Sequence, residues 1–281
     1  MKLFKVALVL LASWGFVSAG YAETNAGNRT SNSTDNNVRI RYNKPATAEL
    51  SGIASQLKAN SVISDVIALI NEQFSLPEPL AIVFGAADGP LYDYDANEIL
   101  IPYTFLEQVA NRFKAADYAN PDISIAEATN DALVHTLFHE LAHALIAIHQ
   151  LPVVGKEEDA ADSLAAVLSI EYFSNGAEIA ISAADLFYLE SSDIEEFEEA
   201  DFWDEHSLDL QRYYATLCHV YGSDPKKYAY LLEDTGFSQE RADFCINEYD
   251  SAVTNWLALL APYMVTASES VEPEIVAPTI K

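Results

Sequence analysis

The sequence predicts a mainly helical α+β fold with a small β-sheet near its N-terminus. Apolar residues recur at helical spacing over most of the chain, whereas short β-favouring runs precede the longest helical pattern. Half of the 281 residues are hydrophobic, so the chain can bury a core although its formal net charge is -28. We expect one domain over residues 46–265.

The first elements of the domain are predicted to be a helix and then strands. Apolar residues recur at helical spacing over residues 53–70, and Leu76-Pro77 ends that pattern. The apolar run at residues 80–84 predicts a strand. Two β-favouring runs around an Asp/Asn turn predict a hairpin over residues 91–101.

The longest helix is predicted from about Ser124 to His149. Pro121-Asp122 ends the preceding segment, and Leu151-Pro152 ends the helix itself. The helix is apolar over most of its circumference, so we expect it to be buried at the centre of the domain. Residues 157–172 predict a second helix that folds back antiparallel to the first.

The rest of the domain, from Glu178 onward, is predicted to be mostly helical. Turns are expected at residues 222–225 and at Thr235-Gly236, where Gly, Ser, Asp and Pro interrupt the helical pattern. The last residues, 266–281, are rich in Pro, Glu and Ser and are expected to fray.

The N-terminus predicts export. Residues 1–22 contain two lysines, an apolar run and small residues before a cleavage point after Ala22, as in a secretory signal peptide. The alternative is an uncleaved membrane anchor, but the run is shorter than the roughly 20 residues that a spanning helix needs. Residues 23–45 are expected to be a flexible leader. We therefore expect a periplasmic or secreted protein without membrane insertion after the signal is removed.

The two cysteines, Cys218 and Cys245, are expected to form a disulfide in an oxidising compartment. Such a bridge stabilises by roughly 3 kcal/mol in the chain-entropy account. The alternative is two separate buried thiols.

The charge excludes several classes of partner. Fifteen Lys and Arg stand against 43 Asp and Glu, and a strongly acidic protein is repelled by nucleic acid and by anionic membrane surfaces. Acidic residues crowd residues 190–209, and no Lys or Arg lies between Lys156 and Arg212. We expect a solvated acidic face there. The alternatives are a surface that attracts cationic peptides or a weak Ca²⁺ site.

The longest predicted helix contains the motif His139-Glu140-Leu141-Ala142-His143. Histidines four residues apart lie on one helix face, so both imidazoles can reach one Zn²⁺ ion. Glu140, between them, can act as general base toward a water molecule. The alternative is a helix with two incidental histidines, but buried imidazoles without partners are unfavourable, whereas a metal satisfies them.

A catalytic zinc site needs a third protein ligand, and the acidic start of the next predicted helix offers candidates. The helix dipole can account for Glu157 and Asp159. Glu158 and Asp162 differ because they lie one turn apart on the same face. One carboxylate can bind the metal while the other accepts a hydrogen bond from a ligand histidine.

This combination resembles the gluzincin metallopeptidases, which implies a zincin-like domain. The resemblance implies that Glu158 is the third zinc ligand and that Asp162 orients His139. More closely, the mature chain resembles a bacterial family of predicted metallopeptidases catalogued mainly as a domain of unknown function. That resemblance rests on residues 139–143, 151–162, 204–212 and 221–225 and on the pair Cys218 and Cys245.

One difference from the gluzincin pattern leaves the identity of the third zinc ligand open. Only 14 residues separate His143 from Glu158, fewer than in thermolysin-like enzymes. An antiparallel return could therefore bring Asp162 level with the histidines instead. We prefer Glu158 because its longer side chain can make up for its displacement from the two histidines along the helix axis.

Other residues are candidates for supporting roles. A metallopeptidase needs a hydrogen-bond donor that faces the oxyanion formed when water attacks the peptide carbonyl, and His206, Tyr213 or Tyr214 can supply it. The alternative for His206 is a residue that only starts a helix. His135 and His149 are expected to be packing or surface residues. By analogy with the fold, the strand near residues 99–103 is a candidate edge for pairing with an extended substrate.

We therefore expect a zinc-dependent metallopeptidase that hydrolyses peptide bonds in peptide or protein substrates. One alternative is a non-catalytic, zinc-stabilised binding or assembly protein of the envelope. Glu140 argues against it, because a structural site has no use for a base and usually has four protein ligands. The other alternative is a metal-dependent hydrolase of non-peptide substrates.

Overall fold

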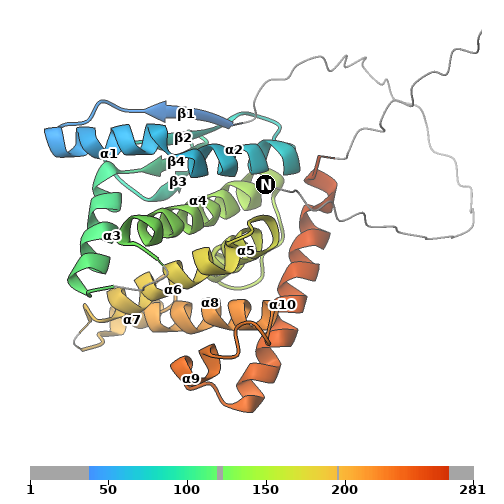
Figure 1. Cartoon of the computed structure of the whole chain (residues 1–281). Coiled ribbons are helices and arrows are strands. Elements are labelled where there is room, and N and C mark those ends of the chain that lie inside the picture. Colours follow the sequence, from blue (N-terminus) through green and yellow to red (C-terminus); the bar gives the residue numbers. More distant parts are fainter. Residues whose placement is uncertain (1–37, 119–122, 195, 266–281) are drawn as a thin grey trace, which may run out of the picture. The chain divides into compact units, whose positions relative to one another are not determined.

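A mixed β-sheet and a long, buried helix occupy the N-terminal half of the structure (Figure 1). The computed structural model describes residues 38–118, 123–194 and 196–265, and the structural statements here concern those ranges. Several predicted features lie outside them: the signal peptide at residues 1–22, most of the leader, the break at Pro121-Asp122 and the tail at residues 266–281.

The strands are β1 (Val38–Tyr42), β2 (Leu80–Phe84), β3 (Leu91–Asp93) and β4 (Glu98–Ile101). The helices are α1 (Ala48–Ala59), α2 (Ser61–Gln73), α3 (Tyr103–Ala115), α4 (Ile125–His149), α5 (Glu157–Tyr172), α6 (Gly176–Ser191), α7 (Glu199–Trp203), α8 (Asp209–Ser223), α9 (Leu231–Thr235) and α10 (Gln239–Leu260), followed by the short turn η1 (Ala261–Tyr263).

The described sheet has the strand order β1-β2-β4-β3, in which β1, β2 and β4 are parallel and β3 is antiparallel to β4. This confirms the predicted strand at residues 80–84 and the hairpin over residues 91–101. The predicted substrate-pairing edge at residues 99–103 is wrong, because Ile99 pairs with Ile82 on one side and with Tyr92 on the other. The free edge on this side of the sheet belongs to β3.

Two elements at the start of the domain differ from the prediction. Residues 38–42, assigned to the flexible leader, instead form β1, which pairs with β2 and buries Val38. The helical pattern over residues 53–70 belongs to two helices rather than one. Asn60 separates them: its backbone N–H bonds to the Leu57 carbonyl, while its side chain caps α2.

The central helix α4 agrees closely with its prediction. It starts with a capping box between Ser124 and Glu127, which satisfies backbone N–H groups that have no partner inside the helix. It ends at Gln150, which adopts a left-handed conformation with φ 51°. In Figure 1, α4 lies between the sheet and the pair α5 and α6, and it contacts all of them. Its side chains are buried over most of its length.

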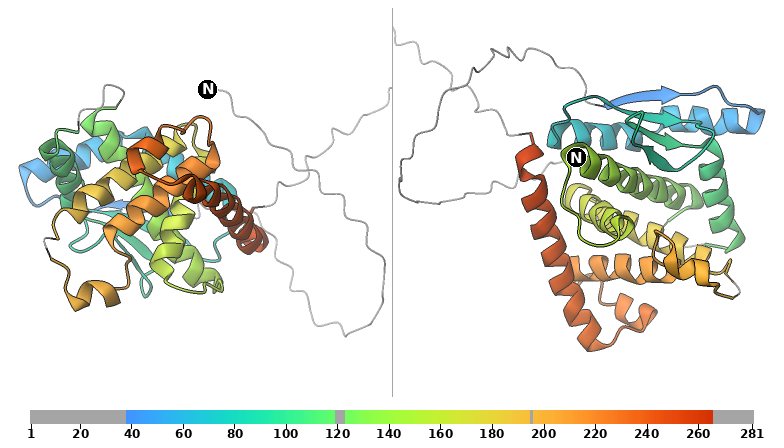
Figure 2. Two further views of the ribbon diagram at one scale, coloured as in Figure 1. Left: turned by 90° about the horizontal axis from the view of Figure 1, so that it is seen from below. Right: turned by 180° about the vertical axis from the view of Figure 1, so that it is seen from behind.

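The C-terminal helices form a second cluster that packs around α8. Helix α10 lies across α8 and α5 (Figure 2), and the predicted disulfide between Cys218 and Cys245 joins α8 to α10. Both predicted turns are present, since α8 ends at Ser223 and α9 ends before Gly236, whose φ of 69° suits glycine.

Among the described helices, no single one is long and apolar enough to cross a membrane. The helices α1 and α2 meet the length and composition criteria only as a pair bent by 52°.

Candidate metal site

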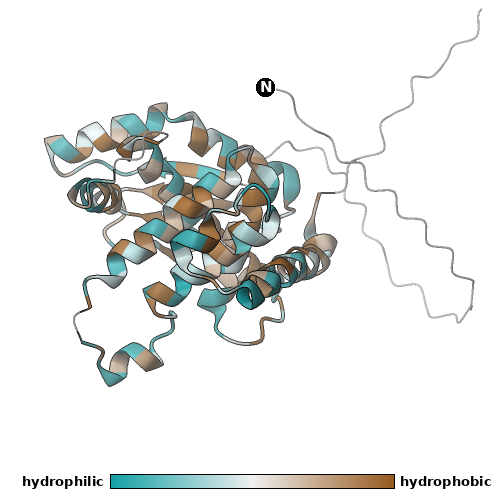
Figure 3. Ribbon diagram, turned by 60° about the horizontal axis from the view of Figure 1, so that its bottom comes forward, coloured by the Kyte–Doolittle hydropathy of each residue, from teal (hydrophilic) through white to brown (hydrophobic). Residues whose placement is uncertain are grey.

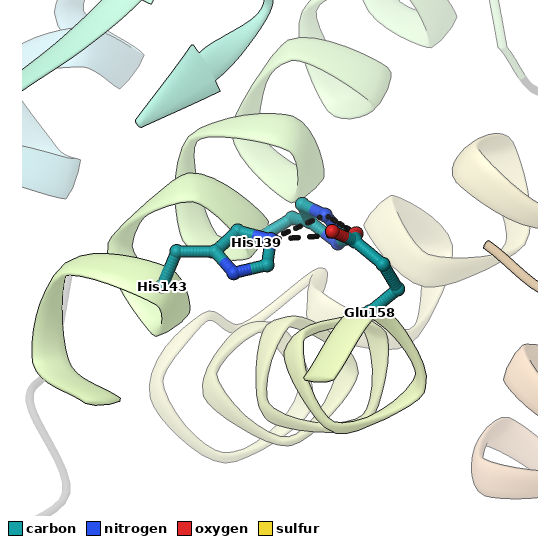
Figure 4. Close-up of side chains that lie close together, drawn as sticks. All are labelled: His139, His143 and Glu158. Atoms are coloured by element: carbon teal, nitrogen blue, oxygen red, sulfur yellow. Dashed lines mark hydrogen bonds and ion pairs between the residues drawn. The ribbon is translucent and has the colours of Figure 1, made fainter. Parts of the chain in front are cut away.

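His139 and His143 lie one turn apart on α4 and point toward the start of α5 (Figure 4). Both side chains are buried, and their rings meet edge to face. The Nε2 atoms of the two imidazoles are 3.2 Å apart. The helical spacing therefore places two nitrogen donors side by side, as the sequence predicts.

Glu158 supplies a third donor atom from the first turn of α5. Its Oε2 lies 3.0 Å from His139 Nε2 and 3.4 Å from His143 Nε2. Donor atoms bound to one tetrahedral zinc ion at bond lengths of 2.0 to 2.1 Å are about 3.3 Å apart. The three observed distances fit that requirement, so His139, His143 and Glu158 can hold one metal ion.

Asp162 lies on the other side of His139, away from this group of donor atoms. Its Oδ1 is 2.8 Å from His139 Nδ1, and the Arg212 guanidinium donates two hydrogen bonds to the same carboxylate at 2.7 and 3.0 Å. The Arg212 side chain also stacks on the Phe187 ring at 3.9 Å. In this arrangement Glu158, rather than Asp162, lies beside the two Nε2 atoms.

His143 has a carboxylate partner of its own. Its Nδ1 lies 2.8 Å from Glu157 Oε1, and that oxygen also accepts a hydrogen bond from the Tyr94 hydroxyl at 3.0 Å. Because Glu157 contacts His143 while Asp162 contacts His139, α5 runs antiparallel to α4, as predicted. Sequence reasoning missed this role of Glu157. The requirement that each ligating histidine has a partner for its second nitrogen could have suggested it.

The donor set favours a positive charge at its centre. Burial lowers the pKa of His139, but hydrogen bonds to Asp162 and Glu158 outweigh that effect and raise the pKa to about 9. Burial alone would raise the pKa of Glu158, yet hydrogen bonds with His139, His143 and His206 hold it far below its ordinary value. A bound cation can supply the positive charge that these carboxylates otherwise draw from protonated imidazoles.

Glu140 is buried next to the histidines and faces a cavity of about 160 Å³. Burial raises the pKa of its carboxyl, an effect that His139 and His143 oppose together with a hydrogen bond from the Tyr92 backbone N–H. His139, His206 and Arg212 also line this cavity, together with apolar side chains of Phe105, Leu186 and Phe187. The cavity is therefore lined by the Glu140 carboxylate, by His139 of the candidate metal ligands and by an apolar wall.

Of the three predicted oxyanion donors, the structure brings His206 alone to the site. Its Nε2 lies 3.0 Å from Glu158 Oε2, and burial of its ring is partial. Tyr213 packs against Tyr188, and Tyr214 packs against Phe237.

The two remaining histidines of α4, predicted to be packing or surface residues, pack against aromatic rings. His135 meets Phe187 edge to face, and His149 stacks on Tyr263.

Comparison with family models matches residues 42–260 to the DUF4344 family, described as "Putative metallopeptidase". The chain belongs to this family. Comparisons with curated proteins and with solved structures find no match. Membership in DUF4344 supports a metal-dependent peptidase that acts on peptides or proteins, and the described residues contain a group that can bind the metal.

Proposed function

We propose that the protein is an exported, gluzincin-type zinc metallopeptidase with its active site at His139, Glu140, His143 and Glu158. The convergence of the three donor atoms within 4.8 Å of one another carries the proposal. Glu140 supports catalysis over a purely structural role, because this acid faces the cavity beside the donors without being one of them.

In this proposal, His139, His143 and Glu158 hold the zinc ion. When bound, zinc acts as a Lewis acid and lowers the pKa of water to roughly 7. Glu140 accepts a proton from the water whose oxygen attacks the peptide carbonyl carbon. Glu140 then returns that proton to the leaving nitrogen as the C–N bond breaks.

Neighbouring groups prepare the site for this reaction. Asp162, held by Arg212, and Glu157 accept hydrogen bonds from the Nδ1 atoms of the two imidazoles, which leaves each Nε2 available as the atom that would bind the metal. We assign to His206, whose Nε2 lies 3.0 Å from Glu158 and which lines the same cavity as Glu140, the role of hydrogen-bond donor toward the developing oxyanion. Strand β3 has the free sheet edge beside α4, so it replaces the interior β4 as the candidate edge for an extended substrate.

Export is part of the same proposal. The disulfide between Cys218 and Cys245 is compatible with an oxidising compartment, where such bonds persist. We expect N-terminal sequencing of the protein recovered from the envelope fraction or the medium to begin at Glu23. An N-terminus at Met1 in membrane pellets would instead support the uncleaved anchor.

The decisive experiment is Glu140→Gln in the mature protein, with zinc content and hydrolysis of an unfolded protein substrate measured together. We expect one zinc per chain to be retained while kcat falls by about 10² to 10⁴. Glu72→Gln on α2 is the matched control, because Glu72 is an exposed acid of another helix. Unchanged turnover in Glu140→Gln would falsify the mechanism.

The same assay separates the alternatives. Cleavage of esters or amides without cleavage of peptides points to a hydrolase of other substrates. A wild-type protein that binds zinc, unfolds on its removal and cleaves nothing points to a structural zinc protein. For the third ligand, we expect Glu158→Ala to lose stoichiometric zinc and Asp162→Ala to keep it with weaker affinity; the reverse pattern assigns the ligand to Asp162.

A further inference from the structure

A group of exposed aromatic side chains lies close to the proposed active site. We call residues 196–206 the aromatic arm; it includes α7 and projects from the helices between α6 and α8 (Figures 2 and 3). The side chains of Phe197, Phe202 and Trp203 are 52%, 66% and 74% exposed, and the first two rings lie 5.8 Å apart. Several solvent-exposed aromatic side chains close together are typical of an interaction site.

The charge of the aromatic arm indicates the kind of partner. The arm contains no Lys or Arg, and its six acidic residues are Glu196, Glu198, Glu199, Asp201, Asp204 and Glu205. Within the described ranges, no Lys or Arg nitrogen forms a salt bridge with any of these carboxylates. Aromatic faces and carboxylates both attract Lys and Arg side chains, so the complementary partner is basic and partly apolar.

The aromatic arm is fastened at its C-terminal end to the proposed active site. Lys156, just before α5, donates hydrogen bonds from Nζ to the carbonyls of Asp204 and His206 at 2.9 and 2.8 Å. His206 in turn lies 3.0 Å from Glu158. Trp203 precedes His206 by three residues, so their Cα atoms are at most about 11 Å apart. A substrate whose cleaved peptide bond lies in the proposed active site would therefore need only a few further residues to reach the aromatic rings of the arm.

We propose that the aromatic arm binds a basic, partly apolar segment of the polypeptide substrate, a few residues from the bond that is cleaved. This inference rests on the proposed peptidase function and names its substrate class. A second copy of the chain is a poor occupant, because both surfaces would be acidic. An anionic membrane surface is repelled for the same reason.

The first test measures binding without turnover. The Glu140→Gln protein is titrated with three peptides that share their phenylalanines and differ only in Lys, Gln or Glu at the intervening positions, and tryptophan fluorescence is followed. We expect the Lys peptide to bind at least tenfold more tightly than the Glu peptide, with an affinity that weakens as salt rises. Trp203→Phe, which keeps an aromatic ring, should remove most of the fluorescence change. Equal affinities for the three peptides overturn the proposal.

The second test uses turnover. The variant Phe202→Ser/Trp203→Ser removes two rings from an exposed surface, and Phe244→Ser on α10, 54% exposed, is the matched control. For a cleavable core with a basic, aromatic flank, we expect KM to rise about fivefold or more in the double variant and to stay unchanged in the control. For the bare core, both kcat and KM should remain at wild-type values. An unchanged KM for the flanked substrate contradicts the proposal.

The two tests separate the inference from the proposed function. If the wild-type protein cleaves no peptide, the peptidase proposal fails, and the binding titration still decides what the aromatic arm recognises. If peptides are cleaved without preference for basic flanks, the peptidase proposal stands and the aromatic arm has no role in selecting substrates.

Discussion

The two histidines of the candidate metal site have different surroundings. His139 is backed by Asp162, whose charge is matched by Arg212, and all three side chains are largely buried. His143 is backed by Glu157, whose side chain is 38% exposed and whose further partner is the mostly exposed Tyr94. The His139 side is thus a buried ion pair tied to α8, whereas the His143 side is a hydrogen bond chain open to water.

This difference indicates separate roles for the two sides. A buried ion pair is strongly coupled to folding, because removal of one partner leaves an unpaired charge in a medium of low dielectric constant. A partly exposed carboxylate can lose its partner to water at little cost, so its effect is confined to the orientation and basicity of the imidazole. Substitutions on the His139 side should therefore affect both the unfolding free energy and metal binding. Substitutions on the His143 side should affect metal binding alone.

The largest effect is expected for Asp162→Asn. This change removes the carboxylate that accepts two hydrogen bonds from Arg212 and leaves Asp209, 3.8 Å away, as the remaining ion-pair partner of the guanidinium. We therefore expect the metal-free protein to lose about 3 kcal/mol of unfolding free energy. Zinc affinity should also fall by about 10- to 100-fold. Urea denaturation and chelator competition measure the two quantities, with the exposed Asp159→Asn as control. If stability is unchanged, the buried pair has no structural role.

A buried acid that has no cationic partner should have the opposite effect on stability from Asp162 when its charge is removed. Asp131 on α4 accepts a hydrogen bond from Ser182 at 3.1 Å, and burial raises its pKa from 3.8 to about 6. Because the folded protein binds more protons than the unfolded chain between about pH 4 and 6, stability falls as the pH rises through this window.

We therefore expect Asp131→Asn to raise the unfolding free energy by about 1 to 3 kcal/mol at pH 7.5 and to have little effect below pH 4. Denaturation curves across this pH range test the expectation. A destabilising effect at pH 7.5 contradicts it and indicates that the charged form of Asp131 is needed.

On the exposed side, Glu157→Gln should weaken zinc binding by about tenfold, because a neutral amide makes the His143 imidazole a weaker donor. The unfolding free energy should stay within about 0.5 kcal/mol of wild type. Chelator competition and urea denaturation again give both numbers. A loss of stability as large as that of Asp162→Asn would remove the distinction between the two sides.

The smallest effect is expected for Tyr94→Phe, which removes only the hydroxyl that bonds to Glu157. We expect zinc affinity to fall by less than fivefold, since the bond between Glu157 and His143 remains and water can replace the hydroxyl. The same competition assay applies. An effect larger than that of Glu157→Gln would show that Tyr94 acts on the site by another route.

Local signals in the sequence were sufficient for the central part of the fold. The Ser124 and Glu127 capping box, the apolar length of α4 and the return after Leu151 are all encoded within short segments, and so is the spacing of His139 and His143. The interruption at Asn60 escaped prediction because a polar cap without Gly or Pro scarcely disturbs helical periodicity. Strand β1 escaped it because Val38 is its single buried residue.

The contacts that complete the site could not be predicted from local patterns. Arg212 is 50 residues from Asp162, and Tyr94 is 63 residues from Glu157. Nothing in the sequence near these residues states which distant side chain they meet, because that depends on how α8 and the β3-β4 turn pack against α5. Whether Glu158 or Asp162 lies beside the two Nε2 atoms likewise depends on the position of α5 along the axis of α4.

The disulfide matters to anyone who prepares the protein. Arg212 and Cys218 lie on the same helix, so the bridge to α10 fastens the element that holds Asp162 in place. Because such a bridge acts mainly by restricting the unfolded chain, we expect its reduction to leave the contacts around His139 intact and to lower the stability of the fold by roughly 3 kcal/mol. Material made in a reducing cytosol would then keep the geometry of the candidate metal site but unfold more readily.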